Sequence, residues 1–88
     1  MAASNGEARL VAVFASIHYV LAAERVFKQH GLWYDLVPTP RDISSDCGLV
    51  LEFRAADLEA ATPVFADPRV KQQAVYRRTL DGHEPVTL

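Results

Sequence analysis

The sequence predicts an α+β fold in which one antiparallel sheet carries two helices on one of its faces. Three observations lead to this class. Half of the 88 residues are apolar, which is enough for one packed core. Short apolar runs typical of strands alternate with segments whose apolar residues recur every three or four positions, as in helices. The order of these segments is strand, helix, strand, strand, helix, strand.

The first strand and the first helix are expected within residues 10–30. Residues 10–15 form an apolar run with two valines, which is typical of a buried central strand. Ser16 offers a hydroxyl that can cap the N-terminus of the following helix. The inward face of that helix is predicted to consist of Ile17, Val20, Ala23 and Phe27. Gly31 is expected to end the helix in the left-handed conformation, which glycine adopts without steric penalty.

A second strand is expected at residues 32–37 and a third at residues 49–54, where apolar and polar residues alternate clearly. The segment between them, residues 38–48, is rich in proline, serine and aspartate and is predicted to be a loop. A connection this long between neighbouring strands is unusual in a small domain, and such loops are often functional.

The second helix is expected to follow Asp57, which is a good N-cap residue. Its helical stripe is predicted to consist of Leu58, Ala61, Thr62 and Phe65. Pro63 lies inside this stripe and is expected to kink or split the helix, because proline lacks the amide hydrogen that the helix needs. A last strand is expected around residues 74–77, and the Asp81-Gly82 pair predicts a tight turn after it.

The element order βαββαβ is typical of a ferredoxin-like two-layer sandwich with the sheet order 4-1-3-2. Residues 84–88 could add a short C-terminal edge strand, since Pro85 is tolerated only at an edge. One domain is expected, with a flexible tail at residues 1–7, a core at residues 8–80 and a C-terminal extension at residues 81–88.

In this topology, the loop at residues 38–48 and the start of the first helix emerge at the same end of the sheet. Cys47 is therefore expected to lie near the N-terminus of the first helix. The residues expected to supply most of the core are Leu10, Ala12, Phe14, Val20, Phe27, Leu36, Leu49, Leu51, Phe53, Leu58 and Phe65.

The composition of the chain argues against several classes of function. The formal charge of -2 gives no general attraction to nucleic acid or to an anionic membrane. A single cysteine cannot form an intramolecular disulfide, and a domain this small without disulfides favours a reducing compartment, so a soluble cytoplasmic protein is predicted. The longest apolar stretch, residues 10–15, is too short to span a membrane. No histidine pair has metal-ligand spacing, so no metal site is expected.

Cys47 is the strongest candidate for chemistry, because an ionised thiol is a good nucleophile. Arg41 in the same loop and the nearby helix N-terminus could support the thiolate, and His18 could assist from the first turn of the helix. Hydroxyls in the loop could donate hydrogen bonds to a thiolate or a bound persulfide; they belong to Thr39, Ser44 and Ser45. Gly48 lets a backbone or substrate approach closely. The alternative is that Cys47 is a small apolar residue packed under the loop.

Residues 37–49 read Val-Pro-Thr-Pro-Arg-Asp-Ile-Ser-Ser-Asp-Cys-Gly-Leu. This segment resembles the signature of the selenium/sulfur (Se/S) carrier protein-like family of small bacterial proteins, in which Pro-Thr-Pro-Arg shortly precedes Ile-Ser-Ser-x-Cys-Gly. The Ala-Glu pair at residues 23–24, residues 56–59 and residues 75–77 are also similar to that family. Carried over by position, the resemblance marks Pro38, Thr39, Pro40, Arg41, Ser44, Ser45, Cys47 and Gly48.

The resemblance implies a carrier that holds sulfur or selenium on Cys47 as a persulfide or perselenide. The implied donor is a cysteine desulfurase or a selenocysteine lyase, the acceptor is not specified, and the carrier needs no cofactor and is not an independent catalyst. The alternative is a non-catalytic ligand-binding or protein-interaction module with a structural cysteine, and on either view a homodimer is a further option. An RNA-recognition sheet is disfavoured, because the strands lack interleaved aromatic and basic residues.

Overall fold

The computed structural model describes residues 8–43 and 47–87. The predicted tail at residues 1–7 lies outside these ranges, as do Ser44, Ser45 and Leu88. Within the described ranges no helix combines the length and the apolar character that crossing a membrane requires.

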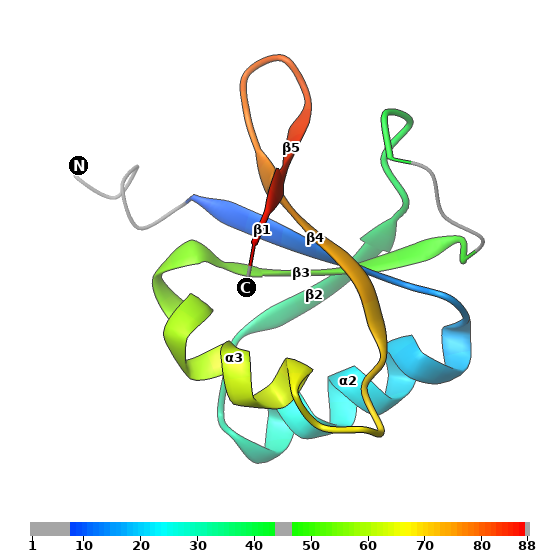
Figure 1. Cartoon of the computed structure of the whole chain (residues 1–88), viewed down its shortest axis with the longest axis vertical. Coiled ribbons are helices and arrows are strands. Elements are labelled where there is room, and N and C mark those ends of the chain that lie inside the picture. Colours follow the sequence, from blue (N-terminus) through cyan, green and yellow to red (C-terminus); the bar gives the residue numbers. More distant parts are fainter. Residues whose placement is uncertain (1–7, 44–46, 88) are drawn as a thin grey trace.

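The elements follow one another in the predicted order, with one strand added at the end (Figure 1). They are β1 (Arg9–Phe14), α2 (Ile17–Gln29), β2 (Tyr34–Pro38), β3 (Leu49–Arg54), a short 3₁₀ helix η1 (Ala55–Asp57), α3 (Leu58–Phe65), β4 (Gln72–Arg78) and β5 (His83–Val86).

The five strands form one sheet in the order β2-β3-β1-β4-β5, and all neighbouring strands are antiparallel. The α+β class, with two helices and an antiparallel sheet, is therefore as predicted. The order differs from the predicted 4-1-3-2 because β5 joins the sheet outside β4. Pro85 lies in this edge strand opposite Tyr76, and an edge strand is where proline is tolerated in a sheet.

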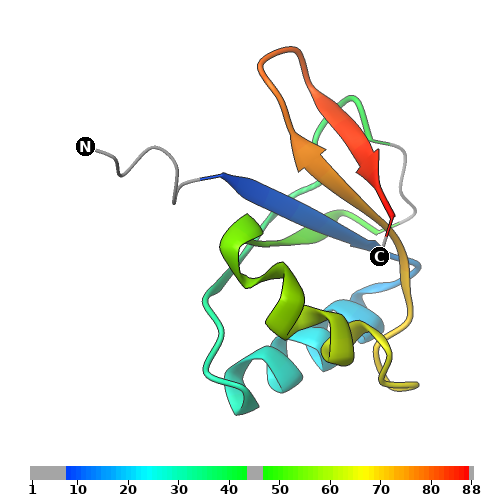
Figure 2. The ribbon, with the colours of Figure 1, turned by 60° about the vertical axis from the view of Figure 1, so that its left-hand side comes forward.

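Both helices cover the same face of the sheet (Figures 1 and 2). Phe27 of α2, Phe53 of β3 and Phe65 of α3 meet there, with ring centroids 5.5 to 5.9 Å apart. Aromatic rings at this spacing bury a large apolar area and attract one another further. Three of the predicted core residues, Leu36, Leu49 and Leu58, are only partly buried at the margin of this cluster, which we call the helix-side core.

A second, smaller cluster lies on the opposite face of the sheet. It consists of Val11, Val13, Ile43 and Val50, with Val37 and Tyr76 packed against it. Ile43 comes from the long loop, so this loop folds over the helix-free face. Strand β1 is consequently buried on both faces, which explains why its sequence is a continuous apolar run.

Helix α2 ends as predicted, with Gly31 at φ 67°. The amide of Gly31 donates to the Lys28 carbonyl, and the amide of Leu32 donates to the Phe27 carbonyl. These hydrogen bonds satisfy carbonyl groups of the last helical turn. Because Leu32 still belongs to this helix end, strand β2 begins at Tyr34, two residues later than expected.

Pro63 does not split α3, which is one helix containing it. Of the predicted kink or split, the split was wrong, because Pro63 lies near the end of a short helix and faces solvent. There it removes only the bond to the Glu59 carbonyl. Ser16 and Asp57 occupy the predicted N-cap positions, but neither side chain caps its helix through a hydrogen bond within the described structure.

Candidate functional site

The loop between β2 and β3 emerges at the end of the sheet where α2 begins (Figure 1). Ala12 pairs with Leu51 in the antiparallel register of β1 and β3, so the end of β1 lies beside the start of β3. The prediction that the loop and Ser16 share one end of the domain is therefore confirmed. On the other side of β1, Phe14 pairs with Gln72, so the chain leaving α3 reaches this end as well.

Thr39 and Gly48 close the base of the loop. The Thr39 amide donates a hydrogen bond of 3.1 Å to the Gly48 carbonyl, one step beyond the Pro38–Leu49 pair that ends the strands. The Thr39 hydroxyl donates a 2.8 Å bond to the carbonyl oxygen of Cys47. Thr39 therefore fixes the backbone that carries the thiol, whereas the sequence had suggested that its hydroxyl serves the sulfur itself.

The described tip of the loop begins with a turn in which the Ile43 amide donates to the Pro40 carbonyl at 3.1 Å. Arg41 and Asp42 occupy the two central positions and are exposed. Ile43 is buried in the cluster on the helix-free face. The turn thus presents two charged side chains to solvent while its last residue anchors it to the sheet.

Cys47 is buried, with 6% of its surface exposed, and its side chain belongs to the helix-side core. The side chains of Ile43 and Cys47 therefore pack on opposite faces of the sheet, Ile43 on the helix-free face and Cys47 on the helix-covered face. A thiol in this position packs as a small apolar group. Any reaction of Cys47 with a second molecule requires a local opening that exposes the sulfur.

Of the remaining predicted site residues, Ser44 and Ser45 lie outside the described ranges, and His18, Pro38 and Gly48 lie at the surface. Pro38 and His18 are exposed, and the ring of His18 contacts the ring of Tyr19 edge-on at a centroid distance of 5.3 Å. Gly48 is exposed, and a Cβ placed on it would meet no atom within 4 Å. The space around Gly48 would therefore accommodate a side chain.

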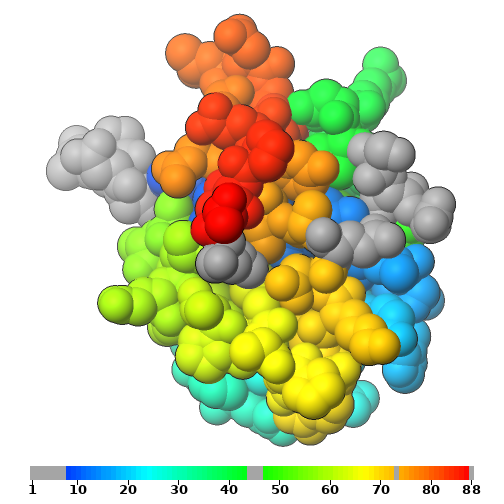
Figure 3. Space-filling model, viewed as in Figure 1, coloured from blue at the N-terminus to red at the C-terminus, as the bar shows by residue number. Residues whose placement is uncertain are grey.

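A contact that the sequence did not predict joins the loop to the C-terminal hairpin formed by β4 and β5. Nδ1 of His83 lies 3.0 and 2.9 Å from the two carboxylate oxygens of Asp42. A carboxylate can only accept, so the imidazole carries a proton on Nδ1 and donates it. This hydrogen bond lowers the pKa of Asp42 from its ordinary value. Figure 3 shows the hairpin and the loop side by side.

Gly82 lies directly against the same carboxylate. Its φ is 150°, and a Cβ placed on it would lie 2.6 Å from Oδ2 of Asp42. A side chain at this position would both strain the backbone and displace Asp42. The pattern that could have indicated the contact is the Asp81-Gly82 turn, but a turn signal does not specify which distant loop the turn meets.

A family model described as "Putative Se/S carrier protein-like" matches residues 9–77. The chain belongs to this family. Searches among curated proteins and among solved structures gave no match.

In this Se/S carrier-like chain, the family match begins at the first residue of β1 and ends within β4. It includes the complete loop with Cys47, which we call the signature loop. It excludes Gly82, His83 and β5. The contact between His83 and Asp42 therefore joins a residue outside the family match to a residue inside the signature loop.

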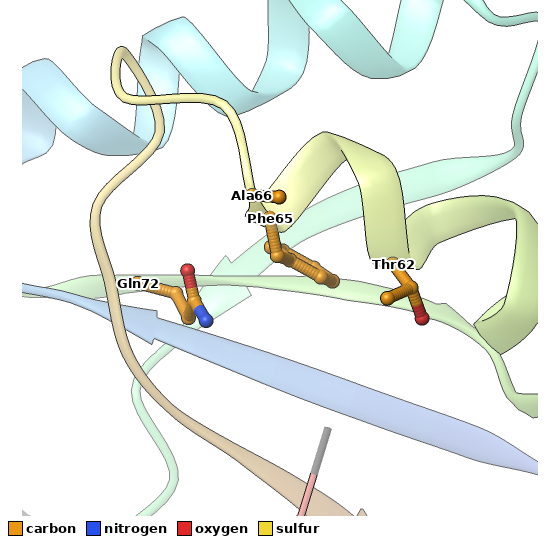
Figure 4. A pocket seen from close by; sticks show the side chains of 4 residues that line it. All are labelled: Thr62, Phe65, Ala66 and Gln72. Carbon is orange, nitrogen blue, oxygen red and sulfur yellow. The ribbon is translucent and has the colours of Figure 1, made fainter.

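A separate open pocket of about 210 Å³ lies between α3 and β4 of the carrier-like domain, and Figure 4 shows its lining. Thr62, Phe65, Ala66 and Gln72 form its walls. This volume is below the range of most small-molecule sites. Within the described ranges, no group of three or more histidine, cysteine, aspartate or glutamate side chains could hold a metal ion.

Proposed function

We propose that the protein carries sulfur or selenium as a persulfide or perselenide on Cys47. The observation that carries the proposal is that the single cysteine of the chain lies in the signature loop of a member of the Se/S carrier-like family. A single thiol suits a carrier, whereas a disulfide oxidoreductase needs a second, resolving thiol.

The transfer step is an exchange without net oxidation. The Cys47 thiolate attacks the outer sulfur of a donor persulfide, the sulfur–sulfur bond of the donor breaks, and the donor leaves as a thiolate. Cys47 then holds the transferred atom in a new sulfur–sulfur bond. The thiolate of the donor takes up a proton from solvent. Selenium transfer follows the same scheme with a donor perselenide.

The loop supplies the proposed roles around this step. Arg41 supports the thiolate once the loop opens, since its exposed guanidinium lies in the same turn-rich segment. Thr39 holds the Cys47 backbone through its hydroxyl. The surface that receives the donor's reactive group is proposed to consist of His18, Pro38, Pro40, Ser44, Ser45 and Gly48.

The proposed donor is a cysteine desulfurase or a selenocysteine lyase, and the product goes to an acceptor protein. The carrier itself uses neither a cofactor nor a metal in this scheme, and it contacts neither nucleic acid nor membrane. A cytoplasmic location is part of the proposal, because a reducing compartment keeps the single thiol available between transfers.

Intact-mass measurement tests the proposal. The protein is incubated with a cysteine desulfurase and cysteine, or with a selenocysteine lyase and selenocysteine, and the mass is recorded before and after reduction. The expected result is the gain of one sulfur or selenium atom, which a reductant removes. Cys47→Ser is the matched control, because a hydroxyl neither ionises near neutral pH nor forms a persulfide. A wild-type mass that does not change with either donor contradicts the proposal.

One observation favours a second function, a ligand-binding or protein-interaction module in which Cys47 is structural. That observation is the burial of Cys47 in the helix-side core. The second function predicts that native Cys47 resists alkylation except when the whole domain unfolds. The carrier function predicts alkylation through a local opening, at a rate that low concentrations of urea leave unchanged.

A further inference from the structure

The C-terminal hairpin holds the signature loop at Asp42. The turn of the hairpin is closed by a 2.7 Å hydrogen bond from the Thr79 amide to the Gly82 carbonyl. This turn places Gly82 and His83 directly against the Asp42 carboxylate. The two strands of the hairpin pair at Arg78–His83 and Tyr76–Pro85, and β4 joins the hairpin to the sheet through its pairing with β1.

His83 is suited to hold a charged group firmly. Its side chain is only 9% exposed, whereas that of Asp42 is 46% exposed. The imidazole is therefore fixed by packing, and Asp42 is the partner that would move away. Nε2 of His83 is buried and has no hydrogen-bond partner within the described residues. Within the described residues, the ring of His83 therefore makes its polar contact through Nδ1, with Asp42 of the loop.

Contacts of neighbouring loop residues connect Asp42 to Cys47. Asp42 adjoins Ile43, which is buried against Val11, Val13 and Val50 on the helix-free face. The same turn continues through Pro40 to Thr39, whose amide and hydroxyl bond to Gly48 and Cys47. Release of Asp42 removes one of the contacts that hold this turn against the sheet. The packing of Ile43 and the two hydrogen bonds of Thr39 then hold the loop without it.

We propose that His83 is a positioning residue that acts through Asp42 to hold the signature loop in the arrangement that buries Cys47. The role of this hold in carrier chemistry rests on the proposed function, but the hold itself is a property of the fold. His83 lies outside the residues that match the family, so the segment after the match, with β5 and the turn before it, sets how often the thiol is exposed.

Alkylation of Cys47 by iodoacetamide under native conditions tests the proposal. His83→Ala is expected to speed alkylation by about three- to tenfold, as the loss of one partly solvent-exposed hydrogen bond implies for an opening equilibrium. His83→Asn is the rescue variant, since its side-chain amide nitrogen occupies nearly the position of Nδ1 and can donate to Asp42. It is expected to restore a rate close to that of the wild type.

Glu84→Ala is the matched control on the same hairpin, because Glu84 lies 3.9 Å from Arg77 in an exposed ion pair that does not involve the loop. It is expected to leave the alkylation rate unchanged. Hydrogen exchange gives a second measurement that does not depend on the thiol. In His83→Ala the amides of Thr39 and Ile43 are expected to exchange faster, while the Ala55 amide, which bonds to Ala8 at the other end of β1, keeps its protection.

An unchanged alkylation rate in His83→Ala overturns the proposal, and so does an increase that His83→Asn fails to reverse. An increase in exchange that is equal at Thr39, Ile43 and Ala55 also overturns it, because it indicates loss of global stability instead of release of the loop. These measurements do not use a sulfur donor. A chain that fails to form a persulfide yet shows the expected alkylation pattern rejects the carrier function and leaves the role of His83 standing.

Discussion

The hydroxyl of Thr39 donates a 2.8 Å hydrogen bond to the carbonyl oxygen of Cys47, so the residue that begins the signature loop fixes the backbone of the residue that carries its thiol. The Thr39 amide bonds to the next residue along, Gly48. Two adjacent residues at the end of the loop are therefore held by one residue at its start. The backbone position of Cys47 depends on this closure.

Thr39→Val is expected to lower the free energy of unfolding by about 1 kcal/mol, because it removes the hydroxyl and keeps the shape of the side chain. Urea unfolding measures this change. The same variant is expected to speed alkylation of Cys47, and Thr39→Ser, which retains the donor, is expected to behave like the wild type. Equal stability of the valine and serine variants would show that the hydroxyl contributes nothing to the closure.

Local patterns in the sequence were sufficient to place most elements. The continuous apolar run before Ser16 predicted β1, and the alternation after Gly48 predicted β3 at its observed bounds. The end of α2 at Gly31 followed from the conformational freedom of glycine. The strand order predicted that Cys47 and the first turn of α2 lie at the same end of the sheet. Because β1 and β3 are antiparallel, the end of β1 lies beside the start of β3.

Other features could not be predicted because they depend on the path of a loop. Ile43 is an isolated apolar residue among polar ones, and no periodicity indicated that it covers Val11 and Val13. The contact between Asp42 and His83 joins residues 41 positions apart. It depends on the direction of the C-terminal hairpin relative to the signature loop, which neither segment encodes by itself. The burial of Cys47 has the same origin, since a loop sequence does not show which side chain turns inward.

Removal of the buried sulfur tests how much Cys47 contributes to packing. Cys47→Ala is expected to lower the free energy of unfolding by about 1 kcal/mol, since it deletes one buried heavy atom and leaves a small void in the helix-side core. Chemical unfolding followed by the fluorescence of Trp33 measures this change. A variant as stable as the wild type would place the sulfur outside the packed core in solution.

Arg41 is expected to raise the reactivity of Cys47 after the loop opens. Arg41→Ala should slow alkylation at neutral pH without changing the free energy of unfolding, because an exposed arginine contributes little to stability. Arg41→Lys retains the charge and should keep most of the rate. The difference between wild type and Arg41→Ala should shrink at high salt, because the interaction is screened. Identical pH profiles of alkylation in all three proteins would exclude a role for Arg41 at the thiolate.

Acid should release the hold of His83 on the signature loop. The hydrogen bond from His83 lowers the pKa of Asp42 in the folded protein, so the folded state binds a proton at this carboxylate less readily than the unfolded chain does. The contribution of this carboxylate to stability is therefore fully present above the ordinary pKa of aspartate, about 3.9, and is lost as the pH falls through the lower folded value. Asp42→Asn removes the titration and keeps an acceptor oxygen.

The stability difference between wild type and Asp42→Asn is expected to be constant from neutral pH down to about pH 5 and to shrink in more acidic solution. Asp67 also titrates in acid, because hydrogen bonds from Arg69 lower its pKa to about 2. Asp67→Asn is therefore the matched control, and its stability difference should persist to lower pH than that of Asp42→Asn. Urea unfolding across the acidic range measures both differences. If Asp42→Asn differs from the wild type by the same amount at every pH, Asp42 is not held as a carboxylate by His83, and the loop is closed by Thr39 and Ile43 without it.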